Sequence, residues 1–89
     1  MLADTLSTFT QHLDILPHEY LRRDLPSGCV IAITDTAASG LPTDNDWLLC
    51  VYASADAFAD ADEPVHVADS DSSVCDLDTA AWHAVRCYA

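Results

Sequence analysis

The sequence predicts an α+β fold in which N-terminal helices pack on a small, mainly antiparallel sheet of three to four strands. Two observations favour this fold: apolar residues recur with helical spacing near the N-terminus, and short β-branched runs alternate with turn residues further along. A chain of 89 residues forms one domain, and a hydrophobic content of 51% can supply a buried core. We therefore expect residues 1–89 to be a single domain.

The first quarter of the chain is expected to be helical. Five large apolar residues have the spacing of an amphipathic helix over residues 3–15: Leu2, Leu6, Phe9, Leu13 and Leu16. A second, short helix is expected to begin at Pro17 and to stop ahead of Pro26, because proline suits the first helical turn and disfavours helix in the residue before it.

Three later segments are expected to form the strands of the sheet: residues 28–34, 46–54 and 63–69. The second of these is apolar on both faces, which indicates a strand that is central or covered on both sides. In the third, Val65 and Val67 are expected to face inward and His66 outward. The last segment is ambiguous, since Asp78 could cap a helix and Trp82–Tyr88 could form an edge strand; the helix is favoured.

Negative charge is the most distinctive property of the sequence. The net charge is −12, from fifteen acidic residues against three arginines and no lysine. Residues 44–78 contain ten of the acids and no base, whereas residues 1–43 contain five acids and two arginines. Nucleic acids and anionic membranes repel such a surface, so we expect neither as a direct partner. The expected partner is a basic protein surface, such as a nucleic-acid-binding complex or a nuclease.

Within this segment the acids recur as D-x-D pairs: Asp44 with Asp46, Asp60 with Asp62, Asp69 with Asp71, and Asp76 with Asp78. In an extended chain the two side chains of such a pair leave the same face about 6.6 Å apart. This separation is similar to that of neighbouring phosphates on a DNA strand. Rows of paired Asp are therefore predicted to imitate a phosphate track and to compete with nucleic acid for a groove lined with Lys and Arg.

The predicted partner-binding residues are the acids of this segment and one aromatic residue: Asp44, Asp46, Asp56, Phe58, Asp60, Asp62, Glu63, Asp69, Asp71, Asp76 and Asp78. Phe58 stands alone among Ala and Asp, so it is either an exposed aromatic anchor for the partner or a plug at the sheet edge. Two alternatives explain the acidic residues without any binding partner. One is a solvated acidic face, and the other is adaptation to a high-salt cytoplasm.

Cofactor and catalytic sites are not expected. His83 and Cys87 have the one-turn spacing of zinc ligands, and Cys75 and His66 could complete a set, but no C-x-x-C motif accompanies them. Cys50 with His66 is a conceivable nucleophilic pair, although Cys50 lies within an apolar strand and is better interpreted as core. We therefore expect no metal, no cofactor and no enzymatic activity.

The compartment is expected to be the cytoplasm. The N-terminal segment has no basic region followed by an apolar one, as a secretory signal would, and the longest apolar run is too short to span a bilayer. In the cytoplasm the four cysteines are expected to be reduced thiols that act as small hydrophobic residues.

In size, charge and the acidic segment 44–78, the chain resembles small, acidic, single-domain inhibitors made by phages and bacteria. These include DNA-mimic, anti-CRISPR and anti-restriction proteins, and the immunity proteins that neutralise nuclease toxins. The resemblance implies a non-enzymatic inhibitor that places its carboxylates against a Lys/Arg-lined nucleic-acid channel of a defence complex. The same charge complementarity allows an alternative that the resemblance also implies, an immunity protein that neutralises a nuclease toxin.

Overall fold

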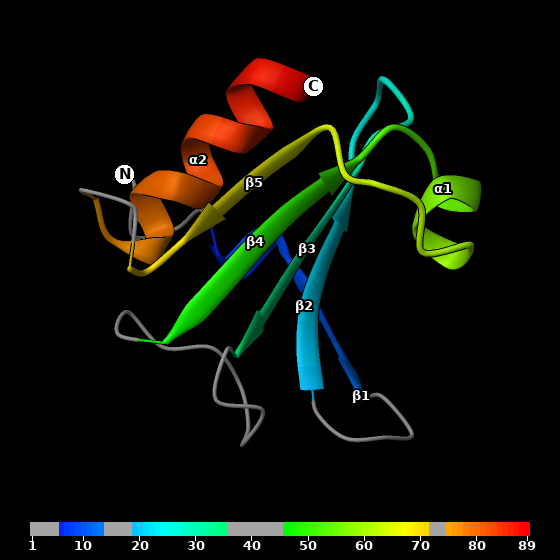
Figure 1. Ribbon diagram of the computed structural model, residues 1–89. Helices are drawn as coiled ribbons and strands as arrows, with labels where there is room; N and C mark the ends of the chain where they lie inside the picture. The colour runs from blue at the N-terminus through cyan, green and yellow to red at the C-terminus, as the bar shows by residue number, and fades with distance from the viewer. Residues whose placement is uncertain (1–5, 14–18, 36–45, 72–74) are drawn as a thin grey trace.

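A single antiparallel sheet of five strands, in the order β1-β2-β3-β4-β5, forms the centre of the molecule in a computed structural model (Figure 1). The structure describes residues 6–13, 19–35, 46–71 and 75–89. The strands are β1 (Thr10–Leu13), β2 (Glu19–Asp24), β3 (Val30–Asp35), β4 (Trp47–Tyr52) and β5 (His66–Asp69). A short 3-10 helix, η2 (Leu6–Thr8), precedes β1; helix α1 (Ala55–Ala59) follows β4 and helix α2 (Leu77–Tyr88) follows β5. Along the described residues, neither α-helix is long and apolar enough to cross a membrane.

The predicted fold class is wrong in its N-terminal part. The helices expected over residues 3–15 and from Pro17 toward Pro26 are absent where the structure describes the chain, because residues 10–13 and 19–24 are strands. Residues 1–5 and 14–18 lie outside the described residues. In the residues that the structure describes, the molecule is therefore mainly β, with five strands in place of three to four, one C-terminal α-helix and one short α-helix.

A tight hairpin loop between β2 and β3 explains why residues 19–24 extend. The Leu25 N–H donates to the Cys29 carbonyl at 2.8 Å, and the Gly28 N–H donates to the Leu25 carbonyl at 2.9 Å. Gly28 has a φ of 100°, a conformation that side chains disfavour and that three-residue hairpin loops require. The loop returns the chain antiparallel to β3, whose backbone groups gain ladder partners on β2. A short isolated helix would gain too few backbone hydrogen bonds to offset the entropy lost in forming it.

The remaining predicted elements correspond to observed ones. The strands predicted over residues 28–34, 46–54 and 63–69 contain or overlap β3, β4 and β5, and the helix favoured for the last segment is α2. The orientation predicted for the third strand is wrong. His66 pairs with Val51, whose side chain is fully buried, so His66 faces the core, whereas Val65 and Val67 are 53% and 52% exposed. Strand pairing with β4 decided this orientation, because a shift of one residue exchanges the two faces.

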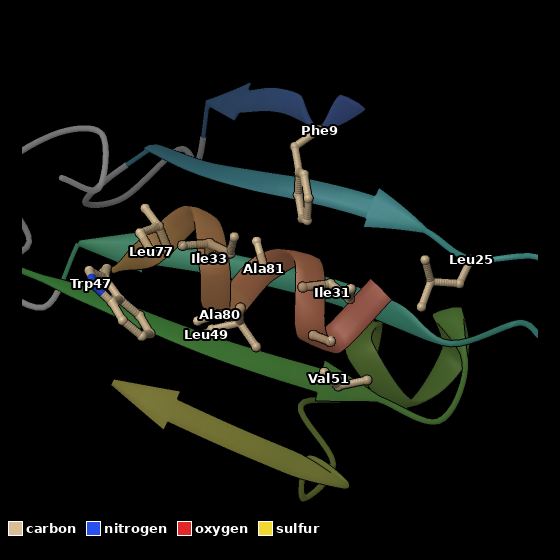
Figure 2. Packing of buried hydrophobic residues seen from close by; sticks show 11 residues of the cluster. Phe9, Leu25, Ile31, Ile33, Trp47, Leu49, Val51, Leu77, Ala80 and Ala81 are labelled. Atoms are coloured by element: carbon tan, nitrogen blue, oxygen red, sulfur yellow. The ribbon is translucent and has the colours of Figure 1, made fainter. Parts of the chain in front are cut away.

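The core lies between the sheet and α2 (Figure 2). Alternate residues of the two central strands point to α2: Ile31, Ile33, Leu49 and Val51, all fully buried. Helix α2 packs against them with Leu77 and three alanines, and the small alanine side chains let the helix approach the sheet closely. We call this side of the sheet the α2 face. The opposite side, against which α1 packs, is the α1 face.

Candidate functional site

The predicted acidic residues form two groups at opposite ends of β4 (Figure 1). The α1 acidic group follows the end of β4 and consists of Asp56, Asp60, Asp62 and Glu63. The α2 acidic group lies where β4 begins, β5 ends and α2 begins, and consists of Asp46, Asp69, Asp71, Asp76 and Asp78. Because β4 has six residues, its two ends lie about 17 Å apart. Asp44 lies outside the described residues.

The α1 acidic group lies on a short capped helix and on the turn that follows it. The Ser54 side chain accepts a hydrogen bond from the Ala57 N–H at 3.0 Å, which caps α1 at its N-terminus. Asp56 stands in the first turn, and Asp60 ends the helix with its backbone N–H bonded to the Asp56 carbonyl. All four carboxylate side chains of the group are exposed, and none has an ion-pair partner among the described residues. Their negative charge is therefore uncompensated locally.

Phe58 fixes this helix to the α1 face of the sheet. Its ring centroid lies 5.2 Å from that of Tyr52 and 5.9 Å from that of Tyr20, and the Arg22 guanidinium carbon lies 4.9 Å from it. These are edge or tilted aromatic contacts and a cation–π contact, each of which stabilises packing. Phe58 is half-buried. The geometry corresponds to the packing alternative for Phe58, although the ring covers a face of the sheet rather than its edge.

The α2 acidic group combines surface charge with structural roles. Ser70 joins the two strand ends, since its N–H donates to the Trp47 carbonyl at 3.0 Å. Asp76 caps α2 by accepting a hydrogen bond from the Thr79 N–H at 2.8 Å. Hydrogen bonds from the side chain and backbone of Thr79 lower the pKa of Asp76. Asp78 is half-buried in the first turn of α2, where the helix dipole stabilises a negative charge.

The extended D-x-D geometry predicted from the sequence is wrong for the described pairs. Asp60 and Asp62 stand in a turn around Ala61, whose φ is 55°. Asp76 and Asp78 open a helix, and of Asp69 and Asp71 only the first belongs to a strand. Aspartate caps helices and forms turns because its short carboxylate bonds nearby backbone N–H groups. Two separate groups of acids therefore replace the regular phosphate-like row.

Between the two acidic groups, the α1 face forms a shallow uncharged groove of about 170 Å³. Its lining is aromatic and small: Tyr20, Ala32, Thr34, Leu48, Cys50, Tyr52 and Phe58. Burial raises the pKa of the Cys50 thiol and that of the neighbouring Tyr52 hydroxyl, so both groups are neutral at physiological pH. Cys50 pairs with Val67 on this face, whereas His66 lies on the α2 face. The structure does not bring Cys50 and His66 together as a nucleophilic pair.

The four residues weighed as zinc ligands form no metal site of three or more ligands in the described residues, although His66, Cys75 and His83 line one groove. His83 Nε2 lies 3.6 Å from Cys87 Sγ, while the His66 ring packs at 5.7 Å from that of Tyr88. Among residues 6–13, 19–35, 46–71 and 75–89, no group of three or more His, Cys, Asp or Glu side chains could hold a metal ion. The Cys87 side chain is exposed, and those of Cys29, Cys50 and Cys75 are half-buried.

Sequence reasoning missed the residues that hold Phe58. Tyr20 and Arg22 were assigned to a helix, whereas in β2 they alternate with Leu21 and share the α1 face. The available signal was the Pro-Ser-Gly sequence at residues 26–28, a hairpin loop between two runs of alternating residues. That signal would have extended the sheet by one strand toward Phe58.

No protein-family model matches this sequence, and neither does any curated protein or solved structure.

Proposed function

We propose that this protein is a non-enzymatic inhibitor, encoded by a phage or a bacterium, that acts in the cytoplasm. It binds the basic nucleic-acid-binding surface of a defence complex, such as a CRISPR effector or a restriction enzyme. The observation that carries the proposal is the α1 acidic group. Its four exposed carboxylates have no ion-pair partner in the described parts of the chain, and they lie on or directly after a helix that Phe58 ties to the sheet. A preordered cluster of this kind loses little conformational entropy when it meets a cationic surface.

The charge distribution favours recognition of an extended basic surface. The two acidic groups lie at opposite ends of β4, a strand roughly 17 Å long, and provide two points of attachment. Lys and Arg side chains of a nucleic-acid channel would meet carboxylates where phosphates normally lie. Complementary potentials of this sign accelerate association and exclude partners of the wrong charge. Direct binding to DNA or RNA is disfavoured by the same charges.

The experiment compares two variants that remove the same number of charges. The site variant carries Asp56→Asn, Asp60→Asn, Asp62→Asn and Glu63→Gln. The control carries Asp4→Asn, Asp14→Asn, Glu19→Gln and Asp35→Asn, which all lie outside the acidic segment 44–78. Each protein is assayed for inhibition of DNA binding and cleavage by a panel of purified CRISPR effector complexes, restriction enzymes and nucleases.

We expect the unmodified protein to inhibit at least one target, with an affinity that falls steeply as KCl is raised. The site variant should lose inhibition while the control retains it, and both should keep the circular dichroism spectrum of the fold. Equal losses in the two variants would mean that net charge, rather than the α1 acidic group, acts. Absence of inhibition across the panel, together with unfolding temperatures that depend only on salt, would instead support salt adaptation.

A further inference from the structure

The last two turns of α2 carry a histidine and a cysteine on the same side of the helix. His83 and Cys87 are four residues apart, both side chains are exposed, and His83 Nε2 lies 3.6 Å from Cys87 Sγ. Residues at this spacing are neighbours on a helix surface. Imidazole and thiolate are also the two side-chain groups that zinc sites use most.

The measured separation agrees with the bite of a tetrahedral metal chelate. A zinc ion lies about 2.3 Å from sulfur and about 2.0 Å from nitrogen, and at a tetrahedral angle of about 109° these lengths put the two ligand atoms about 3.5 Å apart. We propose that His83 and Cys87 form a two-ligand site for a borderline or soft divalent cation of the zinc class. The inference is independent of the proposed inhibitory function, which uses other residues.

The electrostatic surroundings favour a cation at this position. The carbonyl groups at the C-terminus of α2 present partial negative charge, and the molecule has a net charge of −12. Arg86, on the same turn, opposes a cation, but its guanidinium carbon lies 5.1 Å from the centroid of the Trp82 ring and is engaged there. His83 also lines an open groove of about 360 Å³ between α2 and β5, which leaves an approach for the ion.

Binding converts the Cys87 thiol to a thiolate: the metal–sulfur bond forms, the S–H bond breaks, and one proton passes to solvent. His83 binds through the unprotonated Nε2 lone pair. Because the described residues contain no group of three ligands, water fills the other coordination positions. Thiolate and imidazole discriminate against Mg²⁺ and Ca²⁺, which prefer oxygen. This preference separates the site from general attraction of cations to the many carboxylates.

The test is a Cd²⁺ titration of the full chain with its thiols reduced, in excess Mg²⁺ that occupies the carboxylates. The signal is the cadmium–thiolate charge-transfer absorption in the ultraviolet. We expect one Cd²⁺ per chain and release of one proton, with competition by Zn²⁺ but not by Mg²⁺. His83→Ala and Cys87→Ser should each weaken binding by at least about tenfold, since even changes outside the ligand shell cost that much.

Cys50→Ser is the matched control, because Cys50 lies on the α1 face, away from α2. It should leave the titration unchanged. A Cd²⁺ affinity that is unchanged in His83→Ala, or absorption that is lost equally in the Cys50→Ser control, would overturn the site. So would the absence of any thiolate absorption in the unmodified chain, which would leave the 3.6 Å contact as a hydrogen bond only.

Discussion

Phe58 connects helix α1, which carries part of the α1 acidic group, to the sheet. The ring contacts Tyr20 and Tyr52, and it lies under the Arg22 guanidinium group. The Phe58→Ala substitution should lower the free energy of unfolding by about 2 kcal/mol, roughly half the usual loss for a fully buried phenylalanine, because the ring is half-buried. Urea denaturation followed by tryptophan fluorescence measures this loss.

Phe58→Leu keeps an apolar side chain and should recover part of the stability. Hydrogen exchange should show faster opening of the α1 amides in Phe58→Ala than in Phe58→Leu. Unchanged stability in Phe58→Ala would contradict the packing role and would return Phe58 to the alternative of an aromatic anchor for the partner.

Asp76 gives the stability of α2 a dependence on pH. Its folded-state pKa is lowered by the hydrogen bonds from Thr79, so the ionised carboxylate contributes stability above the usual aspartate value of about 4. That contribution is lost as the pH falls through the lower, folded-state pKa. Asp76→Asn keeps the cap but cannot titrate. The melting temperature of this variant should therefore fall less between pH 5 and pH 2, as measured by circular dichroism at 222 nm; identical pH profiles would exclude the capping carboxylate as a cause.

At the scale of elements, α2 depends on small side chains facing the sheet. Ala81 and Ala84 are fully buried against the central strands. Ala81→Leu would force the helix away from the sheet and should cost about 1–3 kcal/mol in thermal or chemical unfolding. Ala59→Leu, at an exposed position of α1, is the control and should change stability by less than about 0.5 kcal/mol. Equal effects of the two substitutions would contradict close packing at the α2 face.

The elements also show how far sequence reasoning reaches. The strands β3 and β4 were predictable because Ile31, Ile33, Leu49 and Val51 belong to dense apolar runs that are buried wherever they pair. Strand β2 was not, because EYLRRD has little β propensity and extends only through its hairpin with β3. The helical spacing of the apolar residues near the N-terminus was a coincidence, because Phe9 packs into the core from the position just before strand β1.

The candidate site was predictable in part for a related reason. The sequence identified the acidic segment and the isolation of Phe58, both of which are local properties of the chain. It could not predict that the carboxylates separate into two groups, since that depends on where β4 and β5 begin and end. The extended geometry assumed for the D-x-D pairs failed because aspartate itself promotes the caps and turns that the structure contains.

At the scale of the whole molecule, a net charge of −12 opposes folding through self-repulsion. The melting temperature should rise as KCl is increased from about 0.01 M to about 1 M, over which the screening length falls from about 30 Å to about 3 Å. Neutralising the α1 acidic group by the four amide substitutions should raise the melting temperature at low salt and reduce its dependence on KCl. A flat salt profile for the unmodified chain would contradict the role of repulsion, and differential scanning calorimetry measures all of these values.

The attachment of α1 has an evolutionary consequence. The side chains of the α1 acidic group make no hydrogen bond or ion pair in the described residues, and the helix is retained by one aromatic ring and a serine cap. Replacement of these acids therefore leaves the folded scaffold intact. If the proposed inhibitory function holds, these acids can change to match a different target while the buried strands stay the same.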